Sequence, residues 1–499
     1  MANAPRLEKV AFQKYSEVTS KNKIECKLGV CEEDLEILNG NANACLLSAE
    51  ISGGEIRYSG KAIFNAVCQM EKEPKIFESG VEFSFKCSSG VSGLNQVLNL
   101  ASVTVCDVEV TKQNGVLLGV ATVVFSGEVC YEEEFEQIAV NGVDLLTKKH
   151  YVEKCDRIAK VEKTFTVQDD FEVNGIVKTV ICHTEKAYLS SSQCGIGSVI
   201  YDGEVELSII LKTSDELGGI IKETRHVPFR LESEISDVIP SLIAISNACV
   251  NGSAVKVYVD ETKNKSSITV VTQISLSSTI YEAGVYNYCQ DAYSTSNNLK
   301  TETSKKVVES IAEVNYKEQK IVGDLAYFDE NAGLICILND KIEEISTSYK
   351  NGELLVKGVI KVDLLLNDNG LLKTQTSLVP FETSFLADCN AVKNVNCLIC
   401  NAVVERLDQK FTLSCTLKVS YACINQKTAT VLVKVEEGDK KVQNDSAISV
   451  YIASKGDELW DVCKALNVSE AVILSNNPDL VFPLEKEERI LIYRELNKE

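Results

Sequence analysis

The chain has 499 residues, and at roughly 150 residues per domain this length predicts three or four domains. Hydrophobic residues make up 45% of it and charged residues 25%, which is typical of globular protein and excludes wholesale disorder. The net charge is −21 and there are only three His residues, so the composition disfavours binding to nucleic acid and a His-based hydrolase or metal site.

The first residues lack the apolar stretch of a secretory signal, and no run of 18 apolar residues occurs further on. We therefore expect a cytoplasmic protein whose 19 cysteines are free thiols that act as small buried hydrophobes. Cys397 and Cys400 have CxxC spacing, but no second pair or nearby His completes a zinc site, so we expect no metal and no cofactor. Zinc or redox use there is the minor alternative, and later oxidation of the thiols stays open.

One pattern recurs along the chain: a Gly early in a strand-like run, followed 23 to 26 residues later by Val-x-Phe, with Pro as the middle residue in two copies. The Gly and Phe residues concerned are Gly60 and Phe83, Gly203 and Phe229, and Gly358 and Phe381. The Phe positions are 146 and 152 residues apart. We predict three tandem copies of one module, at 1–134, 160–283 and 313–425.

Each copy is expected to be rich in β-strands. Residues 411–423 alternate strictly, with every odd-numbered residue apolar or aromatic, which is the signature of a strand with one buried face. A Gly inside a strand pattern often marks a bulge or a close backbone approach. Pro228 and Pro380 remove a hydrogen-bond donor, which predicts an edge strand or a strand start at those positions.

Polar segments without clear periodicity separate the copies. Residues 135–160 and 284–312 are expected to be spacers between modules. Residues 436–446 form the sharpest boundary, because Val442 is their only apolar residue. After this boundary the sequence no longer shows the recurring Gly and Val-x-Phe pattern.

From Ser449 onward the sequence predicts a strand, two short helices and a closing strand. Asp457 is placed to cap a first helix with apolar positions from Leu459 to Leu466. Ser469 is placed to cap a second helix, whose buried positions we expect to be 472–474, and 489–493 should close the unit as a strand. We therefore predict a small β-α-α-β domain at 448–494.

This order of motifs resembles a LysM domain, a module that binds polymers containing N-acetylglucosamine, such as peptidoglycan and chitin. The resemblance is carried by Gly-Asp-Glu-Leu-Trp at 456–460, Asn-Pro-Asp-Leu at 477–480 and Ile-Leu-Ile-Tyr at 490–493. It implies that a ligand or partner binds between two loops, while Trp460 matches a position that is usually core. The loop residues are Lys455, Gly456, Asp457, Glu458, Asn477, Pro478, Asp479, Leu480, Val481 and Phe482. An acidic run at 485–488 replaces the usual Gly, which favours a protein ligand.

Three such β-modules followed by one LysM domain resemble a clostridial family of spore-coat morphogenetic proteins, whose repeat is the DUF3794 module. The resemblance implies work in the mother-cell cytoplasm at the forespore surface. It also implies that the LysM domain contacts the stage IV sporulation ATPase, which forms the basement layer of the coat.

We therefore expect a mainly β, non-enzymatic spore-envelope scaffold that links coat proteins, without nucleic acid or membrane insertion. The alternative is a protein of the spore cortex or cell wall whose LysM domain grips peptidoglycan directly. An enzyme ranks third, because no GxSxG, HExxH, P-loop or GxGxxG motif occurs.

Overall fold

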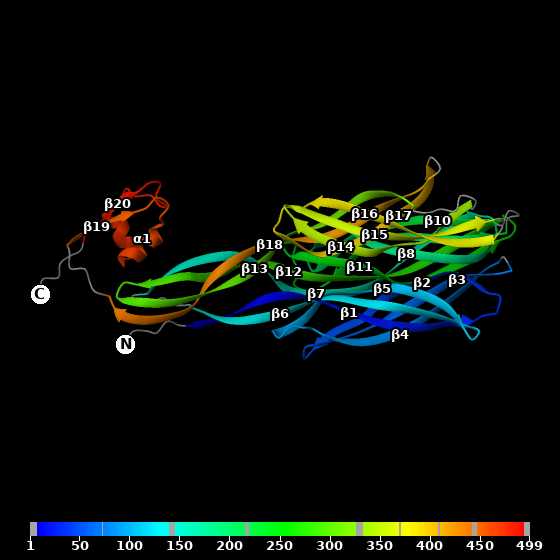
Figure 1. The fold of residues 1–499 in the computed structure, drawn as a ribbon, viewed down its shortest axis with the longest axis horizontal. Helices are drawn as coiled ribbons and strands as arrows, with labels where there is room; N and C mark the ends of the chain where they lie inside the picture. The colour runs from blue at the N-terminus through cyan, green and yellow to red at the C-terminus, as the bar shows by residue number, and fades with distance from the viewer. Residues whose placement is uncertain are drawn as a thin grey trace.

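The computed structural model describes residues 7–71, 73–138, 145–214, 219–325, 333–368, 371–407, 410–441 and 447–493. These residues form an elongated, mainly β protein, with two short helices near the C-terminus (Figure 1). The prediction of a mainly β fold is therefore confirmed.

The strands fall into successive sets of six. The first set comprises β1 (Leu7–Val30), β2 (Glu36–Ser52), β3 (Glu55–Met70), β4 (Glu73–Ser88), β5 (Leu94–Gln113) and β6 (Val116–Ile138). The second comprises β7 (Leu145–Asn174), β8 (Val177–Cys194), β9 (Ser198–Thr213), β10 (Ile220–Glu234), β11 (Ile243–Asp260) and β12 (Lys265–Ser294). The third comprises β13 (Asn297–Asp324), β14 (Gly333–Lys350), β15 (Glu353–Asp368), β16 (Leu371–Leu386), β17 (Ala391–Leu407) and β18 (Lys410–Lys440).

Each set has the same connections. Its first, sixth and fifth strands form one antiparallel sheet, in the orders β1-β6-β5, β7-β12-β11 and β13-β18-β17. Its second, third and fourth strands form another, in the orders β2-β3-β4, β8-β9-β10 and β14-β15-β16. Buried apolar side chains from both sheets of a set pack together, so each set is a small sandwich with its own core.

The three sets close into a ring. Strand β4 of the first set contacts β8 of the second, β10 contacts β14 of the third, and β16 returns to contact β2 of the first. One core cluster therefore draws on all three sets, and it includes Val67, Ile210 and Leu365. Each of these residues lies seven positions after the recurring Gly of its set. Equivalent residues thus meet where the sets converge.

The Gly and Phe residues of the recurring pattern are cross-strand partners. Gly60 pairs with Phe83, Gly203 with Phe229 and Gly358 with Phe381. A Cβ at any of the three glycines would overlap the partner Phe ring and a backbone carbonyl of the strand on the other side. The Gly is therefore required by close approach, as the sequence indicated, and the Phe ring fills the space that the missing side chain leaves.

Two further patterns have the predicted structure. Pro228 and Pro380 lie in β10 and β16, which are edge strands, where a missing N–H donor is tolerated. The alternating odd-numbered residues of 411–423 are all buried along β18. The period of two therefore identified both the strand and its buried face.

The prediction that 135–160 and 284–312 are irregular spacers is wrong, because most of these residues lie in β6, β7, β12 and β13. Strands β7 and β12 are 30 residues long each, and β18 is 31. Four strand ends together form what we call the stalk. They are the starts of β7 and β13 and the ends of β12 and β18, at 145–150, 297–303, 288–294 and 432–440. Apolar contacts among Leu145, Cys289 and Leu432 hold it together. Part of the expected boundary, 442–446, lies outside the described residues.

The C-terminal unit (447–493) follows the order β19 (Ile448–Ala453), α1 (Leu459–Leu466), α2 (Glu470–Asn476) and β20 (Glu488–Tyr493). The first helix is capped by Glu458 rather than by Asp457, because Glu458 and Asp461 form a capping box. Ser469 does occupy the N-cap of α2. Of the three positions expected to be buried in α2, Ile473 is buried and Leu474 is 43% exposed, because the helix has only two turns.

Candidate functional site

The first loop that the LysM resemblance singles out lies against Leu484, two residues after the end of the second loop. Gly456 N–H donates to the Leu484 carbonyl at 2.8 Å, and Leu484 N–H donates to the Asp457 carbonyl at 3.0 Å. Gly456 has a φ of +93°, which a residue with a side chain rarely adopts, so this turn favours Gly. The two segments therefore form one continuous edge of the C-terminal unit, with Lys455 and Glu458 exposed on it.

Several predicted site residues hold the loops rather than face solvent. The carboxamide of Asn477 donates to the carbonyls of Ile473 and Leu491 at 3.0 and 2.8 Å and accepts from Leu491 N–H at 2.9 Å. The Asp457 carboxylate accepts from Ser454 N–H at 2.8 Å. Both side chains are thus committed to the unit's own backbone, whereas Pro478 and Asp479 are exposed.

The apolar rim of the second loop is narrower than the sequence suggests. Val481 is 79% exposed, but Leu480 and Phe482 are half-buried against the core of the C-terminal unit. Of these three residues, Val481 is therefore the one free to contact a partner.

The first loop touches the stalk. Lys148 Nζ of β7 lies 2.5 Å from Glu458 Oε2, and this contact holds the pKa of the Glu458 carboxyl below its usual range. The C-terminal unit is therefore connected to the sandwiches by side-chain contacts as well as by the chain.

The indole of Trp460 lies at the centre of this contact and is 8% exposed. Its Nε1–H donates to Asp291 of β12 at 3.0 Å, and its ring packs edge-on against Tyr293, with 4.9 Å between ring centres. The Tyr293 hydroxyl donates to the Val468 carbonyl at 2.7 Å. The sequence predicted a buried Trp460 but not that the stalk supplies part of its surroundings.

Asp291 carries the charge of this contact. Lys464 Nζ of α1 lies 2.6 Å from its carboxylate. Burial opposes the charged form, but the hydrogen bonds from Lys464 and Trp460 prevail and lower the pKa of Asp291. The sequence gives no sign of this role, because Asp291 lies in a segment expected to be a spacer.

The outer face of the β19–β20 sheet is apolar and uncovered. Ile448, Val450 and Ile452 alternate on β19 and are each 58–60% exposed. Tyr493 and Leu491 are paired with Ile448 and Val450 in register, so they lie on the same face. The helices cover the opposite face. The sequence indicates an apolar outer face, because apolar residues at nearly every position of 448–453 predict contacts on both faces of the strand.

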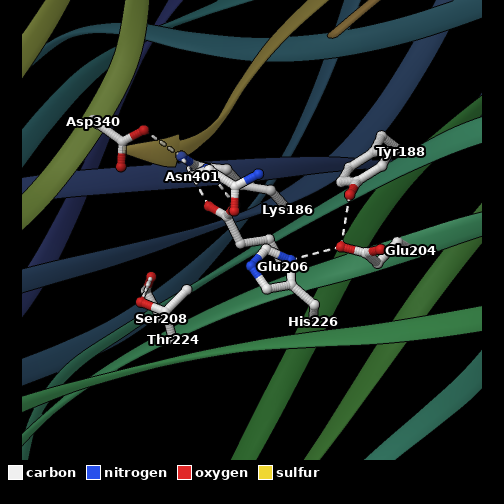
Figure 2. A network of polar contacts seen from close by, with 9 residues as sticks. All are labelled: Lys186, Tyr188, Glu204, Glu206, Ser208, Thr224, His226, Asp340 and Asn401. Carbon is white, nitrogen blue, oxygen red and sulfur yellow. Dashed lines mark hydrogen bonds and ion pairs between the residues drawn. The ribbon is translucent and has the colours of Figure 1, made fainter. Parts of the chain in front are cut away.

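A second polar cluster joins the second and third sets (Figure 2). Lys186 of β8 forms an ion pair with Asp340 of β14 and lies 3.7 Å from Glu206 of β9. Burial disfavours the charged ammonium, but these two carboxylates outweigh it and raise the pKa of Lys186. Glu206 also accepts from Asn401 N–H of β17 at 2.5 Å. The cluster therefore connects the two sets across their interface.

Neighbouring side chains extend the network on the same sheet. Glu204 accepts from the Tyr188 hydroxyl at 2.6 Å and lies 2.6 Å from His226 Nδ1 (Figure 2). Burial and the hydrogen bond to Glu204 raise the pKa of Tyr188. The tyrosine is thereby kept protonated, as a donor that fixes the carboxylate.

A cavity of about 670 Å³ lies among the three sets and is lined by strands from each of them. Its wall mixes apolar side chains with hydroxyl and carboxamide groups, and some polar groups there pair with each other, as Asn396 does with Asn247 and Lys418 with Glu318, each at 2.5 Å. The cavity therefore lies at the interface of the three sets.

The CxxC cysteines do not converge. Cys397 and Cys400 are three positions apart on β17, so their side chains point to opposite faces of the strand. Burial raises the pKa of each thiol to about 12, which disfavours the thiolate that a metal would need. Within the described ranges, no group of three or more His, Cys, Asp or Glu side chains is placed to hold a metal ion.

Comparisons of this chain with protein-family models, with curated proteins and with solved structures found no match. Among the residues that the structure describes, no helix has the length and apolar character needed to cross a membrane.

Proposed function

We propose that this chain is a non-enzymatic scaffold of the spore envelope. In this proposal the three six-strand sets are copies of one DUF3794-like module, and the C-terminal unit is a LysM domain that docks the coat basement ATPase at the forespore surface. The recurring sheet order and the shared Gly–Phe pairs support the first part. The β-α-α-β order and the contact of the first loop with the segment that follows the second loop support the second part.

The observation that carries the docking proposal is the apolar surface of the C-terminal unit. Ile448, Val450 and Ile452 form an exposed apolar row, and Val481 stands out from the second loop. Exposed apolar residues in a row favour contact with a protein surface. A glycan site instead needs polar groups free to bind hydroxyls, and Asn477 and Asp457 are already bonded to the unit's own backbone.

The test uses the full chain and the purified ATPase as partner. Val450→Glu and Val481→Glu place a charge where a protein partner would bury an apolar side chain, and both residues are exposed, so the fold should survive. Losing such an anchor costs on the order of 2 kcal/mol, which is roughly thirtyfold in affinity. Ala471→Glu, an exposed position of α2, is the control and should bind like the wild type.

Trp460→Ala should act differently. Because the indole is buried, its loss should destabilise the C-terminal unit by roughly 3 kcal/mol and lower its melting temperature. Full binding of the ATPase by both Glu variants would refute the docking proposal. Loss of peptidoglycan retention by the same variants, with ATPase binding unchanged, would support direct glycan binding instead.

A further inference from the structure

We propose that Cys389 and Cys423 are a redox pair, which closes to a disulfide within the third set when the protein meets a peroxide. This inference does not depend on the proposed function. It rests on the position of two thiols, on the difference in their exposure and on the hydrogen bonds that fix the corner carrying one of them.

The backbone brings the two residues together. Cys389 lies in the corner between β16 and β17, and Cys423 lies in β18, where it pairs with Val392. Asn390 N–H donates to the Ile424 carbonyl at 3.1 Å, so the corner runs alongside β18 before β17 begins. Both cysteines contact the same apolar core.

The two thiols are close enough to interact, because the Cys389 side chain adds to the effect of burial in raising the pKa of Cys423. Cys389 Sγ also lies 3.1 Å from the Ala391 carbonyl, and Asn315 Nδ2 lies 3.5 Å from Cys423 Sγ. Because both cysteines pack against the same core and the corner runs alongside β18, side-chain rotations can bring the two sulfur atoms to bonding distance.

The corner is held in place by two tyrosines. The Tyr349 hydroxyl lies within hydrogen-bonding distance of the Ala387 and Cys389 carbonyls, at 3.1 and 2.5 Å. The Tyr421 hydroxyl donates to the Leu386 carbonyl at 3.3 Å. These bonds keep Cys389 next to β18, so the thiols stay paired rather than meeting by chance.

Exposure assigns a role to each thiol. Cys389 is half-buried and reachable by a small oxidant, whereas Cys423 is fully buried. Burial raises the pKa of Cys423 to about 12, so this thiol is a poor first nucleophile. Cys389 therefore reacts first, and Cys423 resolves the product.

With hydrogen peroxide as the oxidant, the Cys389 sulfur attacks one oxygen, the O–O bond breaks, and the departing hydroxide takes the thiol proton to form water. The Cys423 sulfur then attacks the sulfenic sulfur of Cys389. The S–O bond breaks, and the leaving hydroxide takes the Cys423 proton to form a second water. Two thiols lose two electrons, and one peroxide becomes two waters.

The experiment treats the reduced full chain with hydrogen peroxide, alkylates the remaining thiols after unfolding, and maps the peptides without reduction. We expect a peptide joining Cys389 to Cys423 among the first products, and its loss on treatment with dithiothreitol. In Cys389→Ser, oxidation of Cys423 should slow by about tenfold, because a buried thiol then lacks its exposed partner. Cys106→Ser removes another half-buried thiol and is the control, with wild-type kinetics expected.

Two results would overturn the proposal. One is Cys389 accumulating as sulfinic acid in the wild type while Cys423 remains alkylatable. The other is Cys423 being lost at the same rate in Cys389→Ser as in the wild type. The mapping of the wild type decides the question even if the variant folds poorly.

Discussion

At the scale of single residues, the recurring glycines are the clearest link between sequence and fold. Gly203→Ala would press a Cβ against the Phe229 ring and the Tyr188 carbonyl, and neither can move without disturbing the sheet. We expect destabilisation of about 2 kcal/mol and a lower melting temperature. Gly252→Ala is the matched control in another strand of the same set, where nothing lies within 4 Å, and it should melt near the wild type. Equal melting temperatures would contradict the close-approach account.

The contact with Phe229 can be tested further. If the ring is what the new methyl group meets, shortening it in Gly203→Ala/Phe229→Leu should recover part of the lost stability. Additive losses in the double variant would instead point to the backbone carbonyl as the main obstacle.

His183 tests the electrostatics of one inter-set contact. Its ring lies 2.8 Å from Glu185 and 3.3 Å from the Ser253 hydroxyl. Burial disfavours the charged ring, but Glu185 and the charge of Glu78 in β4 prevail and raise the pKa of His183. Since the folded pKa exceeds the unfolded one, protonation stabilises the fold at low pH, and this contribution is lost as pH rises through the folded pKa.

We therefore expect His183→Gln to differ from the wild type more at pH 6 than at pH 8. At pH 6 the variant should be less stable than the wild type by about 1.5 kcal/mol, as for the loss of a hydrogen bond to a charged partner. Thermal melting at both pH values measures it, and a difference that is independent of pH would show that the protonated ring contributes nothing.

At the scale of elements, the contact between the stalk and the C-terminal unit depends on Asp291. In Asp291→Ala the Trp460 indole N–H loses its acceptor and Lys464 loses its carboxylate. We expect a loss of about 1 kcal/mol at this contact and faster hydrogen exchange at the indole, while exchange in the sandwiches is unchanged. Asp479→Ala, an exposed position, is the control.

The same contact has a defined pH dependence. Because the folded pKa of Asp291 is lowered, its contribution is present above the unfolded pKa and is lost as pH falls through the folded value. The indole should therefore stay protected at neutral pH and become exposed only in acid. Unchanged indole exchange in Asp291→Ala would refute the role given to this carboxylate.

Strand type and buried faces could be predicted where the apolar period was clean, as along 411–423. The segments 135–160 and 284–312 could not, because their side chains pack against other long strands rather than along one regular face. The exposed face of β19 could not be predicted for a related reason: apolar residues on both sides of a strand indicate contacts on both faces, but only the structure shows that one face is left exposed. Contacts such as Trp460 with Asp291 join residues far apart in sequence, and local pattern carries no sign of them.

At the scale of the whole molecule, contacts between the three sandwiches close them into a ring. The C-terminal unit lies at one end of the elongated molecule (Figure 1). The polar contacts differ between the interfaces of the ring. Lys186 forms an ion pair with Asp340 between the second and third sets, whereas Thr374 donates a hydrogen bond to the Leu38 carbonyl between the third and first sets. These different contacts favour one order of the sets around the ring, because pairing any other two faces would leave buried charges such as that of Lys186 without a partner.

The most direct test of the docking claim is equilibrium binding of the full chain to the purified coat basement ATPase, with sedimentation on insoluble peptidoglycan in parallel. We expect Val450→Glu and Val481→Glu to weaken ATPase binding by roughly thirtyfold, while Ala471→Glu does not and peptidoglycan retains none of the proteins. Wild-type retention by peptidoglycan that both Glu variants lose, with unchanged affinity for the ATPase, would contradict it.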